Sequence, residues 1–218
     1  MKIASQAAFF LAATAFLPSP AGTSRAAGLF PDKALEAAVR EQVFAKRDKK
    51  EPLTAEDVAR VSTVNASGRG IKDLSGLEAC KQLASLDLSK NEVADLKPLA
   101  GLERLQLLDL DTNQDKDLAP LEKLPNLQFL DLDNNQVEDL KPLAGLATLN
   151  TLYLSGNKIK DIGPLAGLTR LWSLYLDDNQ VADLKPIAKL TNLTTLALRG
   201  NGIADVGPKL IAHRFIEP

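Results

Sequence analysis

The chain has 218 residues, of which 45% are hydrophobic and only 5% aromatic, and its formal net charge is −2. This charge disfavours nucleic acid as a partner, because proteins that bind nucleic acid present a basic surface. Cys80 is the only cysteine, which excludes a disulfide within the chain. We therefore expect packing alone to stabilise the fold, with Cys80 as a small buried hydrophobic side chain.

The first 26 residues differ in character from the rest. Lys2 precedes an apolar run from Ala7 to Leu17, and the small residues Ser24 and Ala26 follow. This order is typical of a secretory signal peptide, and the run is too short to span a bilayer comfortably. We expect cleavage after Ala26 and a mature protein that is exported, periplasmic or secreted, with no membrane span. An uncleaved anchor is the alternative.

Residues 27–60 are predicted to form an N-terminal helical cap. Pro31 and Asp32 suit a helix start, and Thr54 suits the N-cap of a short second helix. Such a cap would shield the first core layer of the repeats that follow. The expected apolar face of the first helix has a spacing of four residues, at Leu35, Val39 and Val43.

From residue 83 onward, a leucine returns every 22 residues and opens the phrase L-x-x-L-x-L-x-x-N. Self-similarity of this length and pattern marks a leucine-rich repeat. We expect seven copies over residues 61–214, the first and last atypical, and then a C-terminal tail, 215–218. The opening residues of the clear copies are Leu83, Leu105, Leu127, Leu149, Leu171 and Leu193.

Each part of the repeat predicts a local structure. The alternating leucines predict a short strand with one buried face, and the closing asparagine predicts a turn whose amide bonds to backbone groups. These asparagines would stack as a ladder: Asn91, Asn113, Asn135, Asn157, Asn179 and Asn201. The expected fold is an α/β solenoid. It would be a right-handed superhelix with a concave parallel β-sheet, short helical turns on the convex side and the N-terminal helical cap.

A second row of equivalent residues consists of aspartates. Each one opens an Asp-Leu-x-Pro-Leu segment, or a variant of it, and precedes its proline. We expect each aspartate to cap the short helical turn, because it stands beside that turn's backbone donors. Calcium bridging between carboxylates about 4.8 Å apart is the alternative. The row comprises Asp95, Asp117, Asp139, Asp161, Asp183 and Asp205.

The 22-residue unit with this segment resembles the internalin-type leucine-rich repeat of bacterial exported proteins. The region from Pro31 to Val58 is similar to that family's N-terminal cap, and Ser67 to Ile71 resembles its first, irregular turn. The resemblance covers most of residues 30–214. It implies a binding protein without specifying the partner, because the family's members bind unrelated proteins.

The outward positions of the strands place aromatic side chains beside a cluster of acids. This combination is typical of a binding hot spot, although strands favour aromatic residues and acids keep a solenoid soluble. We expect a protein partner with a basic surface; the alternative is a polysaccharide stacked on Tyr153, Tyr175 and Trp172. The predicted binding residues are Leu107, Asp109, Asp111, Phe129, Asp131, Asp133, Tyr153, Trp172, Tyr175 and Asp177.

Catalysis finds little support in the sequence. His213 is the only histidine, no motif gives it a nucleophilic partner, and no glycine-rich phosphate loop occurs. We expect a monomer that is not an enzyme, with no catalytic residue, no cofactor and no metal.

Asp115 departs from the repeat. It occupies the eleventh position, where the side chain enters the core and other copies carry valine or isoleucine. An unpaired buried carboxylate is costly. We therefore expect either an ionic partner or a local outward distortion over 114–116, with the distortion favoured.

Overall fold

The structure is a computed structural model that describes residues 28–203 and 215–217. The expected signal peptide, Asp205 and His213 lie outside the described residues. Two α-helices begin the described chain, α1 at Lys33–Gln42 and α2 at Ala55–Val58, with the 3₁₀ turn η1 at Phe44–Lys46 between them.

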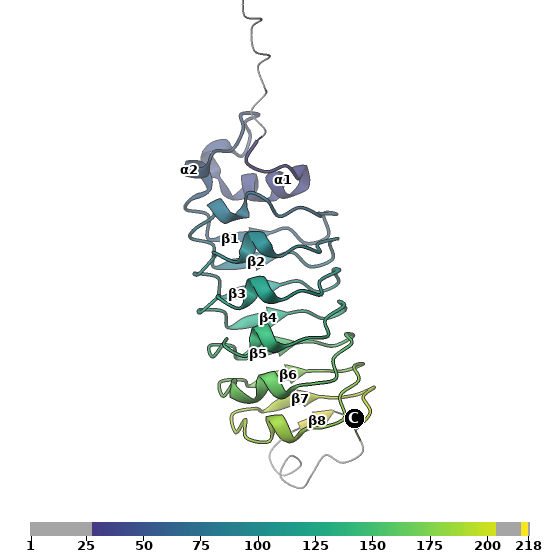
Figure 1. Ribbon diagram of the computed structural model, residues 1–218. Helices are drawn as coiled ribbons and strands as arrows, with labels where there is room; N and C mark the ends of the chain where they lie inside the picture. The colour runs from purple at the N-terminus through teal and green to yellow at the C-terminus, as the bar shows by residue number, and fades with distance from the viewer. Residues whose placement is uncertain (1–27, 204–214, 218) are drawn as a thin grey trace, which may run out of the picture.

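All strands of the described chain belong to one parallel sheet, in which they follow one another in chain order. Figure 1 shows them stacked along one axis, with α1 and α2 at the N-terminal end. Between residues 63 and 197, residues 22 apart are paired, for example Ser85 with Leu107 and Leu107 with Phe129. The strands are β1 Thr63–Asn65, β2 Ser85–Asp87, β3 Leu107–Asp109, β4 Phe129–Asp131, β5 Thr151–Tyr153, β6 Ser173–Tyr175, β7 Thr195–Ala197 and β8 Phe215–Glu217.

The strand β8 lies in the segment that was predicted to be only a C-terminal tail. Residues 215–217 pair in parallel with β7, Phe215 opposite Thr195. The L-x-x-L-x-L pattern does not extend to this segment, so the register alone could not indicate the strand.

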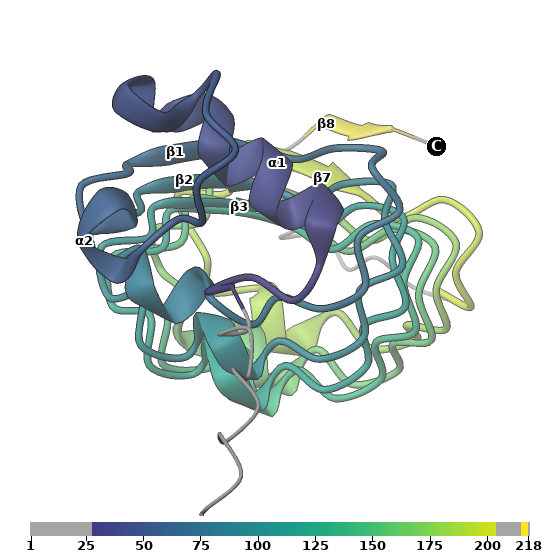
Figure 2. The same cartoon turned by 90° about the horizontal axis from the view of Figure 1, so that it is seen from above.

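Short 3₁₀ turns form the side of the solenoid opposite the sheet, as the view along the stack shows (Figure 2). The predicted capping aspartates are confirmed where the structure describes them. Asp95 Oδ1, for example, accepts a hydrogen bond from the backbone N–H of Lys97, the first residue of η3, at 3.0 Å. Asp117, Asp139, Asp161 and Asp183 accept the equivalent bond. The turns are η2 Leu77–Ala79, η3 Lys97–Leu99, η4 Ala119–Leu121, η5 Lys141–Leu143, η6 Gly163–Gly167 and η7 Lys185–Ile187.

The core between sheet and turns consists of stacked leucine layers, and the opening leucines are almost fully buried. Cys80 is buried in a leucine position, as expected, and burial raises the pKa of its thiol to about 12. A thiol with so high a pKa stays protonated and is a poor nucleophile.

The asparagine ladder is also confirmed. Asn91 Nδ2 donates to the carbonyl oxygens of Leu88 at 2.8 Å and Ala66 at 2.9 Å. Its Oδ1 accepts from the backbone N–H groups of Arg69 and Ile71, which belong to the preceding turn. Each ladder amide thus satisfies backbone groups of two successive turns, and the same Nδ2 bonds recur from Asn113 to Asn201.

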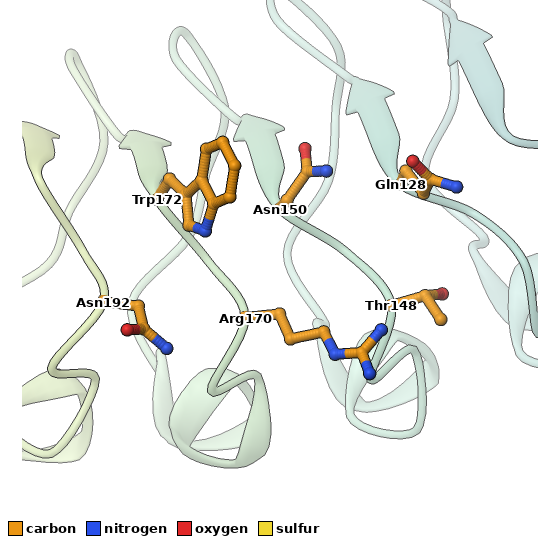
Figure 3. A pocket seen from close by; sticks show the side chains of 6 residues that line it. All are labelled: Gln128, Thr148, Asn150, Arg170, Trp172 and Asn192. Atoms are coloured by element: carbon orange, nitrogen blue, oxygen red, sulfur yellow. The ribbon is translucent and has the colours of Figure 1, made fainter.

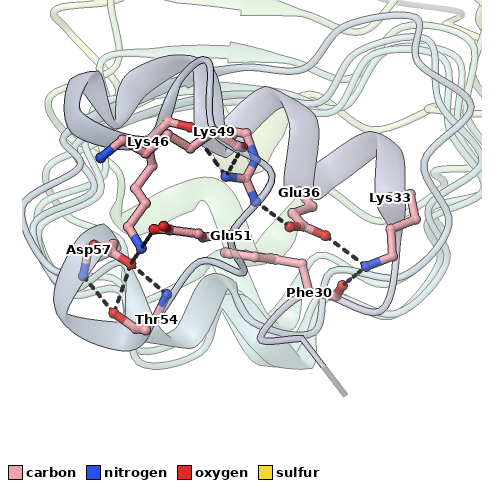
Figure 4. Close-up of polar contacts among 9 residues, drawn as sticks. Phe30, Lys33, Glu36, Lys46, Lys49, Glu51, Thr54 and Asp57 are labelled. Carbon is pink, nitrogen blue, oxygen red and sulfur yellow. Dashed lines mark hydrogen bonds and ion pairs between the residues drawn. The ribbon is translucent and has the colours of Figure 1, made fainter. Parts of the chain in front are cut away.

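The N-terminal helices are held by local polar contacts (Figure 4). Asp32 caps α1 by accepting from the N–H groups of Ala34 and Leu35, and Thr54 forms a capping box with Asp57 at α2. Both helix starts were predicted. Figure 4 also shows Glu36 of α1 bonded to Lys33, at 2.7 Å.

A paired contact joins these helices to the first repeat. Arg69 donates two hydrogen bonds of 2.8 Å to the carboxylate of Glu41 in α1. Arg69 stands where later copies carry the ladder asparagine. In the first copy, the residue at this position therefore contacts the N-terminal cap instead of joining the ladder.

The expected distortion around Asp115 is wrong. The side chain is only 1% exposed, and neither carboxyl oxygen has a hydrogen-bond partner. The turn keeps the regular ladder, since Asp115 N–H donates to Asn135 Oδ1 and its carbonyl accepts from Gln136 N–H, both at 2.9 Å. An outward movement would break these bonds. Burial instead raises the pKa of Asp115 to about 7, so the carboxyl holds a proton below neutral pH.

Candidate functional site

The outward face of β3 to β6 brings most of the predicted binding residues together. Strand register places Asp109 opposite Asp131, Asp131 opposite Tyr153, and Tyr153 opposite Tyr175. Neighbouring strands lie about 4.8 Å apart, so side chains in these rows meet. We call this surface the strand face. It comprises Leu107, Asp109, Asp111, Phe129, Asp131, Asp133, Tyr153, Tyr175 and Asp177.

Three aromatic rings form a continuous row on the strand face. The rings of Tyr153 and Tyr175 are stacked, with centroids 4.3 Å apart and an interplanar angle of 1°. Phe129 meets Tyr153 at 5.6 Å in a tilted arrangement. Leu107 lies next to Phe129 in the sheet and is 37% exposed. The row is a largely apolar platform that a partner could cover.

Acids border this row and are partly buried. Asp109 and Asp131 each accept a hydrogen bond from the backbone N–H two residues further on, at 3.0 and 2.9 Å. Burial raises the pKa of Asp131 to about 7; the bond from Asp133 N–H opposes this rise and the nearby carboxylates add to it. Burial likewise raises the pKa of Asp133 to about 6. Burial also raises the pKa of Asp109.

The acids of the strand face also have a structural role that the sequence analysis missed. Asp133 Oδ1 accepts from the backbone N–H of Ser155, and Asp177 Oδ1 accepts from that of Arg199 at 2.7 Å. Asp111 Oδ1 accepts from Asn134 Nδ2 at 3.0 Å. The recurrence of Asp or Ser at this position of the repeat was the available signal.

Trp172 is not part of the aromatic row. Its indole is 60% exposed, and within the described residues it makes no ring contact with Tyr153 or Tyr175. It stands at the second position of its repeat, just before β6, and lines a separate groove of about 440 Å³ (Figure 3). Trp172 therefore lies apart from Tyr153 and Tyr175, although it was predicted to extend their aromatic row.

Comparison with known proteins identifies the family. Two stretches, residues 125–181 and 189–212, match models described as leucine rich repeat. The chain is 34% identical to internalin C2 of Listeria monocytogenes, over 86% of this chain and 93% of that one, with a TM-score of 0.70. The chain belongs to the internalin family.

Two further solved structures are similar to this internalin-family chain. The internalin inlF of Listeria monocytogenes is 30% identical, with a TM-score of 0.69, over 82% of this chain and 59% of that one. A leucine-rich repeat protein of Leptospira interrogans is 25% identical, with a TM-score of 0.55, over 64% and 43%. A search of curated proteins found no significant match.

Two structural observations bear on other functions. Across residues 28–203 and 215–217, no helix is long and apolar enough to cross a membrane. In the same residues, no three or more His, Cys, Asp or Glu side chains are grouped so that they could hold a metal ion.

One exposed aromatic residue lies outside the repeats. Phe44, in η1 of the N-terminal cap, is 88% exposed, and the Arg47 guanidinium lies 6.0 Å from its ring centroid. It lies outside the repeats, so no periodic signal indicated its exposure.

Proposed function

We propose that this protein is an exported, non-catalytic binding module that takes a protein partner on its strand face. The row of Phe129, Tyr153 and Tyr175 beside partly buried acids carries this proposal. Rigid aromatic side chains supply much contact area at low entropic cost, and they dominate the energetics of many interfaces. Membership of the internalin family supports the same conclusion.

The proposal includes an expected division of the chain: a signal peptide over 1–26, the helical cap over 27–60 and seven repeats over 61–214. The partner surface should be basic, because four aspartates around Phe129 present one sign of charge. Such complementarity speeds association and weakens as salt rises. The protein itself would act as a monomer.

The test is capture of envelope proteins from the native host on the immobilised protein, followed by affinity measurement with each captured protein. Tyr153→Ala and Phe129→Ala should weaken the complex by more than about 1 kcal/mol, roughly fivefold. Thr63→Ala on β1 is the matched control, since Thr63 is exposed on the same sheet face but far from the aromatic row. If all three variants bound the partner as tightly as the parent protein does, the interface would lie elsewhere.

A further inference from the structure

The groove around Trp172 forms a second surface with its own chemistry. Figure 3 shows two rows of side chains from successive repeats, one at the strand starts and one on the loops that precede them. We call it the tryptophan groove. It is lined by Gln128, Asn150 and Trp172 in the first row and by Thr148, Arg170 and Asn192 in the second.

Hydrogen bonds hold three of the side chains that line the groove. Thr148 Oγ1 donates to the carbonyl oxygen of Leu127 at 2.8 Å, and Asn192 Nδ2 donates to that of Thr169 at 2.8 Å. Asn150 Oδ1 accepts from Thr151 Oγ1 at 3.0 Å. These bonds orient the two amides before any ligand arrives.

The same side chains keep unused bonding groups. Among the described residues, no partner is found for Asn150 Nδ2, Asn192 Oδ1 or the Gln128 amide. Arg170 is exposed and forms no ion pair with a described residue, and the groove contains no acid. The groove thus offers amide donors and acceptors, one positive charge and the exposed face of an indole.

We propose that the tryptophan groove binds an acidic saccharide, a sugar ring that carries a carboxylate. The apolar face of a pyranose ring can lie on the indole, while vicinal hydroxyls exchange hydrogen bonds with amides that have both a donor and an acceptor. The guanidinium of Arg170 matches a carboxylate in a two-bond geometry. This site is separate from the strand face, and its failure would leave the proposed protein-binding function intact.

The chain provides an internal comparison. Three repeats earlier, the same flank carries an equivalent groove in which Arg104 corresponds to Arg170 and Asn126 to Asn192. Asn126 Nδ2 makes the equivalent bond, at 2.8 Å, to the carbonyl of Glu103. However, Gln106 stands where Trp172 does, and Glu103 adds a negative charge. The earlier groove therefore has the arginine but lacks the indole.

Fluorescence gives a direct readout, because Trp172 is the only tryptophan in the chain. The full chain is titrated with tetragalacturonate and, as the neutral match, with the same tetrasaccharide carrying methyl-esterified carboxylates. We expect a saturable change in tryptophan emission and a preference of about tenfold for the uronate, typical of a charge-assisted pair. Arg170→Gln should abolish that preference while leaving the neutral sugar's affinity unchanged.

Calorimetry extends the test to variants without the fluorophore. Trp172→Ala and Asn150→Ala should each lose about tenfold or more in uronate affinity. Gln106→Ala, in the equivalent groove, and Tyr153→Ala, on the strand face, should bind as the parent does. Uronate affinity that survives Trp172→Ala would overturn the proposal. The proposal would also be overturned if neither sugar produced a saturable change in tryptophan emission. The same holds if only a single-stranded oligothymidylate produced one.

Discussion

Asp115 gives the sharpest prediction about stability. Its carboxyl is 1% exposed with both oxygens unpartnered, at a position where Val93 and Val137 are fully buried in neighbouring repeats. Asp115→Val should therefore stabilise the protein. The valine side chain fits the layer, as it does in those repeats, and removes a polar group that costs about 1–3 kcal/mol when left without a hydrogen bond.

The gain should depend on pH. Burial raises the pKa of Asp115 from 3.8 to about 7, so between these values the folded state keeps a proton that the unfolded state has released. The free energy of unfolding of the parent therefore falls as pH rises through this window. Three pKa units at about 1.4 kcal/mol each give a loss of about 4 kcal/mol above neutral pH. The valine variant lacks this loss.

The assay is urea unfolding of the parent and Asp115→Val at about pH 4.5 and about pH 8. Subtracting the two proteins at each pH cancels the titration of Asp131 and Asp133. We expect a gain of about 2 kcal/mol at the lower pH and about 5 kcal/mol at the higher. Glu138→Val, at an exposed position in the next repeat, is the control and should change little at either pH. A gain independent of pH, or a loss of stability, would refute the reasoning.

Three other outcomes are expected. Asn135→Ala should cost about 3 kcal/mol or more in urea unfolding, because it leaves buried backbone groups of two turns unpaired; a cost below 1 kcal/mol, on the order of one ordinary bond, would contradict this. Thr112 has a φ of 55°, which favours glycine, so Thr112→Gly should raise the free energy of unfolding by about 1 kcal/mol in the same urea assay. Association with the protein partner should lose much of its salt dependence below about pH 6, because Asp131 and Asp133, with pKa values of about 7 and about 6, become neutral there; stopped-flow mixing at two salt concentrations measures this.

The sequence by itself determined the repeat architecture. A fixed period gives each position the same environment in every copy, so one pattern of leucines, Asn91 and Asp95 predicts all its equivalents. Local chemistry likewise predicted the helix starts at Asp32 and Thr54. These inferences depend on spacing and on bonds between near neighbours, both of which a sequence contains.

Only the tertiary structure decided where individual side chains lie and how they ionise. Trp172 and Tyr175 are three residues apart, yet one lines the tryptophan groove and the other the strand face, because the chain bends at Trp172, just before β6 begins. Asp115 stays buried because its backbone is bonded to the neighbouring turn. The pKa of Asp131 depends on desolvation by residues from other repeats. Each outcome arises from contacts between turns, and those contacts exist only once the turns have stacked.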